Sequence, residues 1–248
     1  MNPLLEHIDR RLRAWSLAHE AGEHAWPVLI PRATLRRAGY YDSFPQLLMT
    51  AAANAQPEAA VEQLQPTAYD LSPAVCYHAY AALENQTVTE GGGRLLAARG
   101  HCFRNELADE LKPGRRQIEF QMRELIFVGA PEWIEQGLMA MQNEIAQMAG
   151  EFAIEGCWAE ANDPFFLPKA EARGKAKLQR LLKTKLEFCI PDGLAIASIN
   201  RHRAFFGERF HITLADGQPA HSACMAFGLE RWAASAGAPD ACSLTPSI

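Results

Sequence analysis

Cys102-Phe103-Arg104-Asn105-Glu106 and Phe120-Gln121-Met122-Arg123-Glu124 are the two stretches that decide the fold of this chain. The first predicts the end of a strand carrying an Arg-x-Glu pattern. The second predicts the strand that returns antiparallel to it, after a loop with turn chemistry at Pro113-Gly114. Much further along, Cys224 lies on another predicted strand, which leads into a helix that begins with Gly228-Leu229-Glu230-Arg231. This order of strand, loop, strand and distant strand-to-helix junction is more specific than any one of the motifs.

Hydrophobic periodicity around these stretches predicts a chain of both helices and strands. Strands are expected at 26–31, 94–104, 117–128, 184–190, 194–200, 210–214 and 220–227. Helices are expected at 3–22, 32–39, 48–63, 131–150 and 169–182, with a last helix from 228. Late strands with segregated helices predict an α+β fold around an antiparallel sheet. Since no repeat or low-complexity linker is present, residues 1–248 are predicted to form a single domain that begins with a helix within 1–25.

The composition is ordinary for a soluble enzyme. Hydrophobic residues make up 48% of the 248 residues and charged residues 21%. No run of about 18 apolar residues occurs, which argues against a membrane span. The first residues, MNPLLEHIDRRLRAW, lack the apolar core and cleavage site of a signal peptide. We therefore expect a cytoplasmic protein.

The cysteines and histidines give little information when each is considered alone. Cysteines occur at positions 76, 102, 157, 189, 224 and 242, and none of them forms a Cys-x-x-Cys pair. A cytoplasmic chain of this size does not need disulfides, so the cysteines are expected to be reduced and mostly buried. The histidines near the motifs, among them His202, are mostly expected to be structural.

The charge of the chain bears on its partners. The formal net charge is −5, which weighs against nucleic acid as the main partner, because neutralisation of phosphates dominates such binding. One segment, 169–185, is nevertheless basic. It contains Lys169, Arg173, Lys175, Lys177, Arg180, Lys183 and Lys185. This segment is either a solvated face or a docking surface for an acidic partner.

The motifs together resemble motifs 2 and 3 of the class II aminoacyl-tRNA synthetase catalytic domain. Further stretches match more closely the archaeal-type, zinc-dependent seryl-tRNA synthetases and their truncated bacterial relatives, the amino acid:[carrier protein] ligases. They are Gly39-Tyr40-Tyr41-Asp42-Ser43-Phe44-Pro45, Cys76-Tyr77-His78, Met122-Arg123-Glu124, Asn162-Asp163-Pro164-Phe165-Phe166, and Ser198-Ile199-Asn200 with His202. The resemblance covers roughly residues 25–235. It implies a class II synthetase-like antiparallel sheet flanked by helices.

This resemblance implies an AMP-forming ligase that activates an amino acid with ATP. Arg104 would bridge the substrate carboxylate and the α-phosphate, and Arg231 would hold the γ-phosphate, so these two are the predicted catalytic residues. The adenine amino group would donate to Glu106. Ser198 and Asn200, with Arg104, would bind the amino acid. Residues 194–197 read Leu-Ala-Ile-Ala where the class often has a magnesium-binding acid, and Glu187 is a possible substitute.

The resemblance also implies a zinc ion held by Cys76, Glu124 and Cys224. Two thiolates and a carboxylate suit zinc better than magnesium, and a catalytic site keeps its fourth position open. In the family, the substrate α-amino group takes that position. Without the resemblance, two buried thiols and a glutamate 48 and 100 residues apart in the chain would not predict a metal site.

The expected acceptor is the phosphopantetheine thiol of an acidic carrier protein, rather than tRNA. Only about 25 residues precede the first predicted catalytic strand, so no tRNA-binding domain is expected. The substrate is expected to be a small amino acid, glycine or alanine, on the basis of the family alone. Two alternatives stay open, a catalytically silent paralogue that binds and regulates, and activation that serves a different thiol or amine acceptor. A homodimer through residues 26–45 is also expected.

Overall fold

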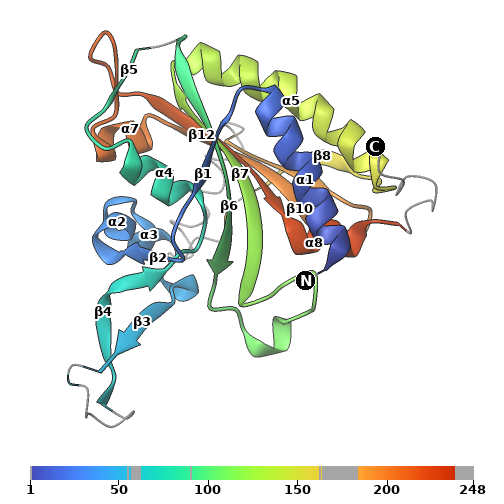
Figure 1. Cartoon of the computed structure of the whole chain (residues 1–248), viewed down its shortest axis with the longest axis horizontal. Coiled ribbons are helices and arrows are strands. Elements are labelled where there is room, and N and C mark those ends of the chain that lie inside the picture. The colour runs from blue at the N-terminus through green and yellow to red at the C-terminus, as the bar shows by residue number, and fades with distance from the viewer. Residues whose placement is uncertain are drawn as a thin grey trace, which may run out of the picture.

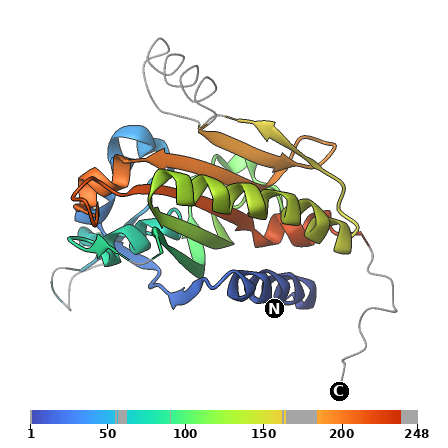
Figure 2. The same ribbon diagram turned by 90° about the horizontal axis from the view of Figure 1, so that it is seen from above.

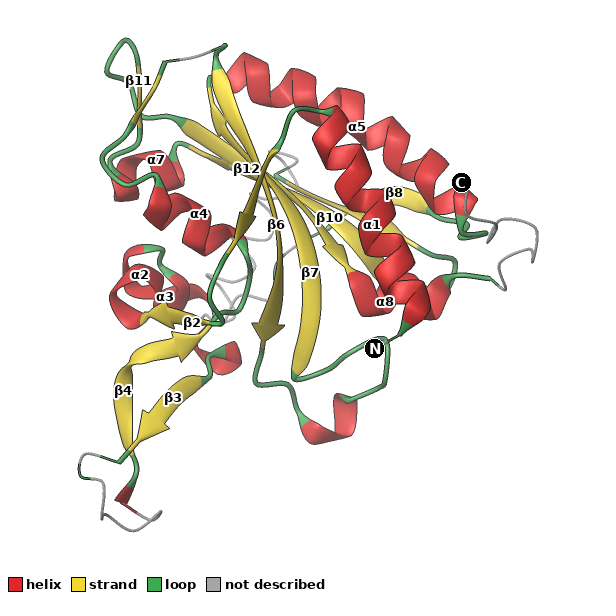
Figure 3. Cartoon of the chain, in the orientation of Figure 1, coloured by secondary structure: helices red, strands yellow, loops and turns green. Residues whose placement is uncertain are grey.

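The structure is a computed structural model, and it describes residues 2–54, 56, 63–89, 91–161, 163 and 184–237. A seven-stranded sheet in the order β1-β6-β7-β12-β10-β9-β8 forms its centre (Figures 1 and 3). Its strands are β1 (Gly22–Ala25), β6 (Gly93–Phe103), β7 (Glu119–Gly129), β8 (Cys157–Glu160), β9 (Lys185–Cys189), β10 (Ala195–Arg203) and β12 (His221–Gly228). β1 is parallel to β6, and every other neighbouring pair is antiparallel. The predicted antiparallel sheet flanked by helices is confirmed.

Helices cover both faces of the sheet. On one face pack α1 (Pro3–Ala18), α5 (Pro131–Glu151) and α8 (Leu229–Ser235), and on the other α4 (Cys76–Ala82) and α7 (Phe205–Phe210). Seen from above, α5 runs alongside the strands (Figure 2). The alternation of β7 fits this arrangement, because Leu125 and Phe127 enter the first core while Ile126 and Val128 enter the second. Among the described helices, none is long and apolar enough to cross a membrane.

A buried ionic network attaches the N-terminal segment to the sheet. Arg123 on β7 donates to Asp9 of α1 over 2.7 Å and to both carboxylate oxygens of Glu23 of β1 over 2.9 and 3.1 Å. Arg99 on β6 donates to Asp9 and Glu6. The N-terminal helix expected within 1–25 ends at Ala18, and residues 22–25 form an edge strand of the main sheet. The ionic network connects both of these elements to β6 and β7.

A smaller three-stranded antiparallel sheet extends from the body (Figure 1). It contains β2 (Leu29–Pro31), β3 (Thr50–Ala53) and β4 (Gln65–Leu71), and nearby lie α2 (Arg32–Arg37), α3 (Tyr40–Ser43) and the 3-10 turn η1 (Pro45–Leu47). The helix expected at 48–63 is wrong at its start, because pairing with β4 overrides the helix preference of the alanines.

Two further expectations concern short or undescribed segments. Instead of a strand at 210–214, α7 ends at Phe210, and β11 (Thr213–Leu214) pairs with β5 (Thr87–Val88). A second 3-10 turn, η3 (Ala108–Glu110), lies between β6 and β7. Most of the basic segment, 169–183, lies outside the described residues, as does the helix expected there.

Candidate active site

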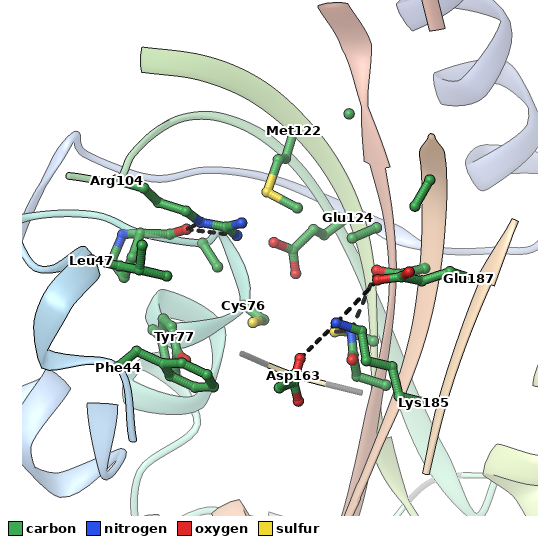
Figure 4. A pocket seen from close by; sticks show the side chains of 18 of the residues that line it. Phe44, Leu47, Cys76, Tyr77, Arg104, Met122, Glu124, Asp163, Lys185 and Glu187 are labelled. Atoms are coloured by element: carbon green, nitrogen blue, oxygen red, sulfur yellow. Dashed lines mark hydrogen bonds and ion pairs between the residues drawn. The ribbon is translucent and has the colours of Figure 1, made fainter. Parts of the chain in front are cut away.

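A cavity of about 570 Å³ lies on the α4 side of the main sheet (Figure 4). All the site residues predicted from the sequence line it. They are Cys76, Arg104, Glu106, Glu124, Glu187, Ser198, Asn200, Cys224 and Arg231. Pockets of this size hold cofactors and small substrates in many enzymes. The motifs, though up to 155 positions apart in the chain, therefore form one site.

The register of the sheet explains why these residues meet. Glu124 on β7 lies opposite Ala226 on β12, Ala226 opposite Ser198 on β10, and Ser198 opposite Glu187 on β9. A second row lies two residues away along each strand, and therefore on the same face. It runs from Cys224 through Asn200 to Lys185. Residues opposite one another in neighbouring strands project to the same face. Each row therefore delivers its polar side chains into the cavity.

Cys76, Glu124 and Cys224 form a compact buried group. Their ligand atoms all lie within 4.8 Å of one another. Cys76 is the first residue of α4, and the other two come from adjacent strands. Glu124 Oε1 accepts a hydrogen bond from the Val75 backbone N–H over 2.9 Å. Its Oε2 is buried and makes no hydrogen bond in the described part of the chain, so this oxygen is available to a ligand.

The electrostatics of this group favour a cation. Burial and the neighbouring charge of Cys224 raise the pKa of Glu124 to about 8. A hydrogen bond between the thiols raises the pKa of Cys76 well above its usual value and lowers the pKa of Cys224. Three acidic groups this close cannot all be charged unless a positive ion compensates them. The donor set of two sulfurs and one carboxylate, with an unused oxygen, fits zinc.

Polar side chains also surround the sulfur of Cys224. Asn200 Nδ2 lies 3.7 Å from the sulfur and His202 Nε2 lies 3.9 Å from it. The other ring nitrogen of His202 lies 3.2 Å from the hydroxyl of Tyr80 and 3.4 Å from that of Ser222. His202 was expected to be structural, so its contact with Cys224 at the cavity was not predicted. Its period-two spacing from Ser198 and Asn200 was the signal that it faces the same side of β10.

Arg104 and Arg231 contact the protein mainly through backbone carbonyls. Arg104 donates twice to the carbonyl of Pro73, at 3.3 Å each, and its guanidinium lies 5.0 Å from the Phe120 ring centroid. Arg231 donates to the carbonyls of Arg115 and Ala195, each over 2.8 Å.

These contacts leave positive charge concentrated in the cavity. Within the described chain, no carboxylate lies within 4.0 Å of either guanidinium, in contrast to Arg116, which pairs with Glu106 over 3.1 Å. Burial and the charge of Arg104 lower the pKa of Arg231. The two arginines are therefore suited to bind an anion.

Lys185 differs from its expectation. The sequence grouped it with a basic surface segment, yet it lies in the cavity with a side chain only 12% exposed. Its ammonium is 2.6 Å from Asp163 and 3.2 Å from Glu187 (Figure 4). Burial opposes its charge, but the two carboxylates outweigh burial and raise its pKa. Lys185 was missed because its role depends on the register of β9 and not on a local motif.

Comparison with known structures shows which class of protein has this fold. The M. kandleri seryl-tRNA synthetase, solved in complex with A. aeolicus tRNASec, superposes with a TM-score of 0.75 at 21% identity, over 94% of this chain and 51% of that one. Giardia lamblia prolyl-tRNA synthetase superposes with a TM-score of 0.70 at 13% identity, over 94% of this chain and 44% of that one. The fold is that of the class II aminoacyl-tRNA synthetases, and this chain spans about half of each of these proteins.

Sequence comparison narrows the class. No protein-family model matches the chain. Amino acid--[acyl-carrier-protein] ligase 1 of Bradyrhizobium diazoefficiens is 32% identical over 93% of this chain and 76% of that protein, and ligase 2 of the same organism is 31% identical over 84% and 66%. The type-2 serine--tRNA ligase of Methanococcus maripaludis is 28% identical over 68% of this chain and 34% of that enzyme. The chain belongs to the amino acid--[acyl-carrier-protein] ligase family.

Proposed function

We propose that this protein activates an amino acid with ATP and transfers the aminoacyl group to the phosphopantetheine thiol of a carrier protein. One observation carries the proposal. A single cavity contains two arginines without a carboxylate partner in the described chain and a Cys-Glu-Cys group with an unused carboxylate oxygen. The first feature suits a triphosphate and a carboxylate, and the second suits a metal that binds an amine.

The arginines supply the electrostatic part of the chemistry. Activation brings a carboxylate and a triphosphate together, and their negative charges repel. Arg104 lines the same cavity as the metal-ligand group, and in our proposal it donates to both the carboxylate and the α-phosphate. Arg231 stabilises the charge that moves onto the pyrophosphate leaving group. Donors that are already held in place need no rearrangement during the reaction, which makes each of them effective.

The metal-ligand group orients the amino acid. Cys76, Glu124 and Cys224 would hold zinc, which, when bound, supplies an open position for the α-amino group. Asn200 and His202 keep the sulfur of Cys224 in place, and Asn200, with Ser198, also offers polar atoms to the substrate. Fixing the amine at one end directs the carboxylate toward Arg104. The reaction therefore relies on positioning and charge, and needs no protein nucleophile.

Glu106 and Glu187 have roles at the nucleotide end. In our proposal, the carboxylate of Glu106 accepts a hydrogen bond from the adenine amino group, and its ion pair with Arg116 keeps the carboxylate in place. ATP enters as its magnesium complex. Glu187 is the residue that would hold the magnesium ion of the nucleotide in our proposal, and in the structure it lies 3.2 Å from the ammonium of Lys185.

The acceptor and the assembly are further parts of the proposal. An acyl adenylate is a strong acyl donor and a thiolate a strong nucleophile, so the transfer needs only that the two meet. We propose a homodimer through the region 26–45. Val28, which precedes β2, and Leu29 and Tyr69 on the smaller sheet are 40%, 41% and 47% exposed, which supports an interface there.

Exchange of pyrophosphate into ATP, measured with each of the twenty amino acids, tests the activation step. We expect exchange with a small amino acid, glycine or alanine, and subsequent labelling of a holo carrier protein but not of bulk tRNA. Absence of exchange with every amino acid would favour the alternative of a silent regulatory paralogue. Exchange without labelling of any carrier would indicate a different thiol or amine acceptor.

A further inference from the structure

Two cysteines outside the cavity face each other across the edge of the main sheet. Cys157 on β8 and Cys189 on β9 are direct partners in the antiparallel register. Both thiols are free, with Cys157 exposed and Cys189 half-buried. From the sequence, the thiols are expected to be mostly buried and unpaired. The structure differs because the pairing depends on the register of β8, a strand that was not predicted.

The side chains of this pair project to the same face. The neighbouring cross-strand pair, Trp158 and Phe188, packs into the core with ring centroids 5.5 Å apart. Since alternate residues of a strand point to opposite faces, Cys157 and Cys189 lie on the other side, the side to which Glu187 projects into the cavity. Directly opposed residues of an antiparallel pair have Cβ atoms about 4.5–5.5 Å apart.

A glycine brings the two backbones close at this point. A Cβ on Gly156 would come within 2.8 Å of the carbonyl oxygen of Cys189 and within 2.6 Å of the Phe188 ring. A side chain at position 156 would therefore push β8 away from β9. The absence of one allows Cys157 to lie directly against Cys189.

We propose that Cys157 and Cys189 are a reversible disulfide site that links β8 to β9 when the protein meets a low-molecular-weight disulfide oxidant. A disulfide requires Cβ atoms about 3.5–4.5 Å apart, closer than the usual cross-strand spacing. Closing the bond therefore draws the strands together, and a strained bond is more easily reduced. The geometry indicates a switch and not a permanent cross-link.

The chemistry balances with glutathione disulfide as the oxidant. The exposed Cys157 thiolate attacks it, forms a mixed disulfide and releases one glutathione thiolate. Cys189 loses its proton and attacks the sulfur of Cys157, which releases the second. Two protein thiols lose two electrons and two protons, and the oxidant is reduced to two thiols. Cys157 is exposed and Cys189 is half-buried, so Cys157 meets the oxidant first and is the first nucleophile.

The bond would also act on the cavity, a consequence that rests on the proposed function. Glu187 is two residues from Cys189 on the same strand, and it holds Lys185. Strain applied at Cys189 displaces β9 at the wall of the site. We therefore expect oxidation to slow pyrophosphate exchange and a thiol reductant to restore it.

Non-reducing peptide mapping of the purified protein after treatment with glutathione disulfide tests the bond without any activity measurement. We expect a cross-linked peptide pair containing positions 157 and 189, opened again by reduced glutathione. It should be absent from Cys157→Ser and present in Cys102→Ser, whose cysteine is buried elsewhere. Alkylation of both thiols after oxidation, or a cross-link that reduced glutathione does not open, would overturn the proposal.

Measurements of exchange activity separate the formation of the disulfide from its effect on the cavity. The Cys157→Ser variant, treated with the same oxidant, shows how much exchange activity is lost through oxidation of Cys76 or Cys224. The wild type should lose more exchange activity than this variant. Equal losses with the cross-link fully formed would refute the effect on the cavity. Absence of exchange in untreated wild type would refute the proposed function, and the peptide map would still decide whether the disulfide forms.

Discussion

Replacing Arg123 by methionine should destabilise the fold while sparing the cavity next to it. Arg123 is 2% exposed and is the cation between Asp9, which is 7% exposed, and Glu23. Methionine keeps most of the length of the side chain but removes the charge and three hydrogen bonds. Asp9 then stays buried, with Arg99 at 3.0 Å as its remaining cation, and Glu23 keeps only the distant, exposed Arg13 at 3.7 Å.

The magnitude follows from what remains after the change. Removing one member of a buried pair typically costs about 3–5 kcal/mol. Because Arg99 still compensates Asp9, we expect the lower end, about 3 kcal/mol. Urea unfolding followed by tryptophan fluorescence measures this loss, and the zinc content should be unchanged. The matched control is Arg11→Met, which breaks an exposed pair with Glu151 and should cost no more than about 1 kcal/mol. Equal losses in the two variants would refute the reasoning.

Three further predictions concern the cavity. Arg104→Ala should lower kcat/KM for pyrophosphate exchange by at least 10²–10³-fold, on the scale of about 2.7–4 kcal/mol per lost donor, and Arg104→Lys should recover only part, since it restores the charge without the planar fork; recovery to wild-type activity would contradict this. Cys224→Ser should remove zinc as measured by elemental analysis and abolish exchange; activity in a zinc-free protein would disprove the metal role. His202→Gln should weaken metal affinity by about 10–100-fold in a chelator competition, as loss of a group that orients a ligand typically does; unchanged affinity would show that His202 does not position Cys224.

The fold and most of the site could be predicted because both depend on the order in which a few recognisable stretches follow one another along the chain. Three stretches of the sequence each indicate one element and the face that it presents to the cavity. They are the run from Arg104 to Glu106, the returning strand with Glu124, and the junction from Cys224 to Arg231. Once the sheet is antiparallel, the register places these faces together. The structure accordingly brings together all the predicted side chains, including the distant Cys76, in one cavity.

What could not be predicted depends on which strands are neighbours. Lys185 reads as part of a basic surface run, and only its position beside β10 turns it into the cavity. Cys157 is an ordinary residue in the sequence, since its partner Cys189 lies on another strand. The spacing of His202 indicates its face of β10, but its contact with Cys224 depends on the neighbouring strand. The alanines at 51–53 favour a helix locally, but β4 pairs with them as a strand. Local propensity is weak compared with such pairing.

The way a substrate would lie in the cavity depends on the direction in which the side chains of β7 point and on the rows of opposed residues across the sheet. Arg123 points toward α1 and stabilises the fold, whereas Glu124, the next residue, points into the cavity. Along β12, Cys224 and Gly228 are four positions apart, about 14 Å on an extended strand, and Arg231 follows in α8. The end proposed to bind the amine and the end proposed to bind the triphosphate are thus connected through one strand, β12, and the helix that follows it. In the proposed reaction, an amino acid held by its amine near Cys224 can present its carboxylate to the phosphates in one orientation.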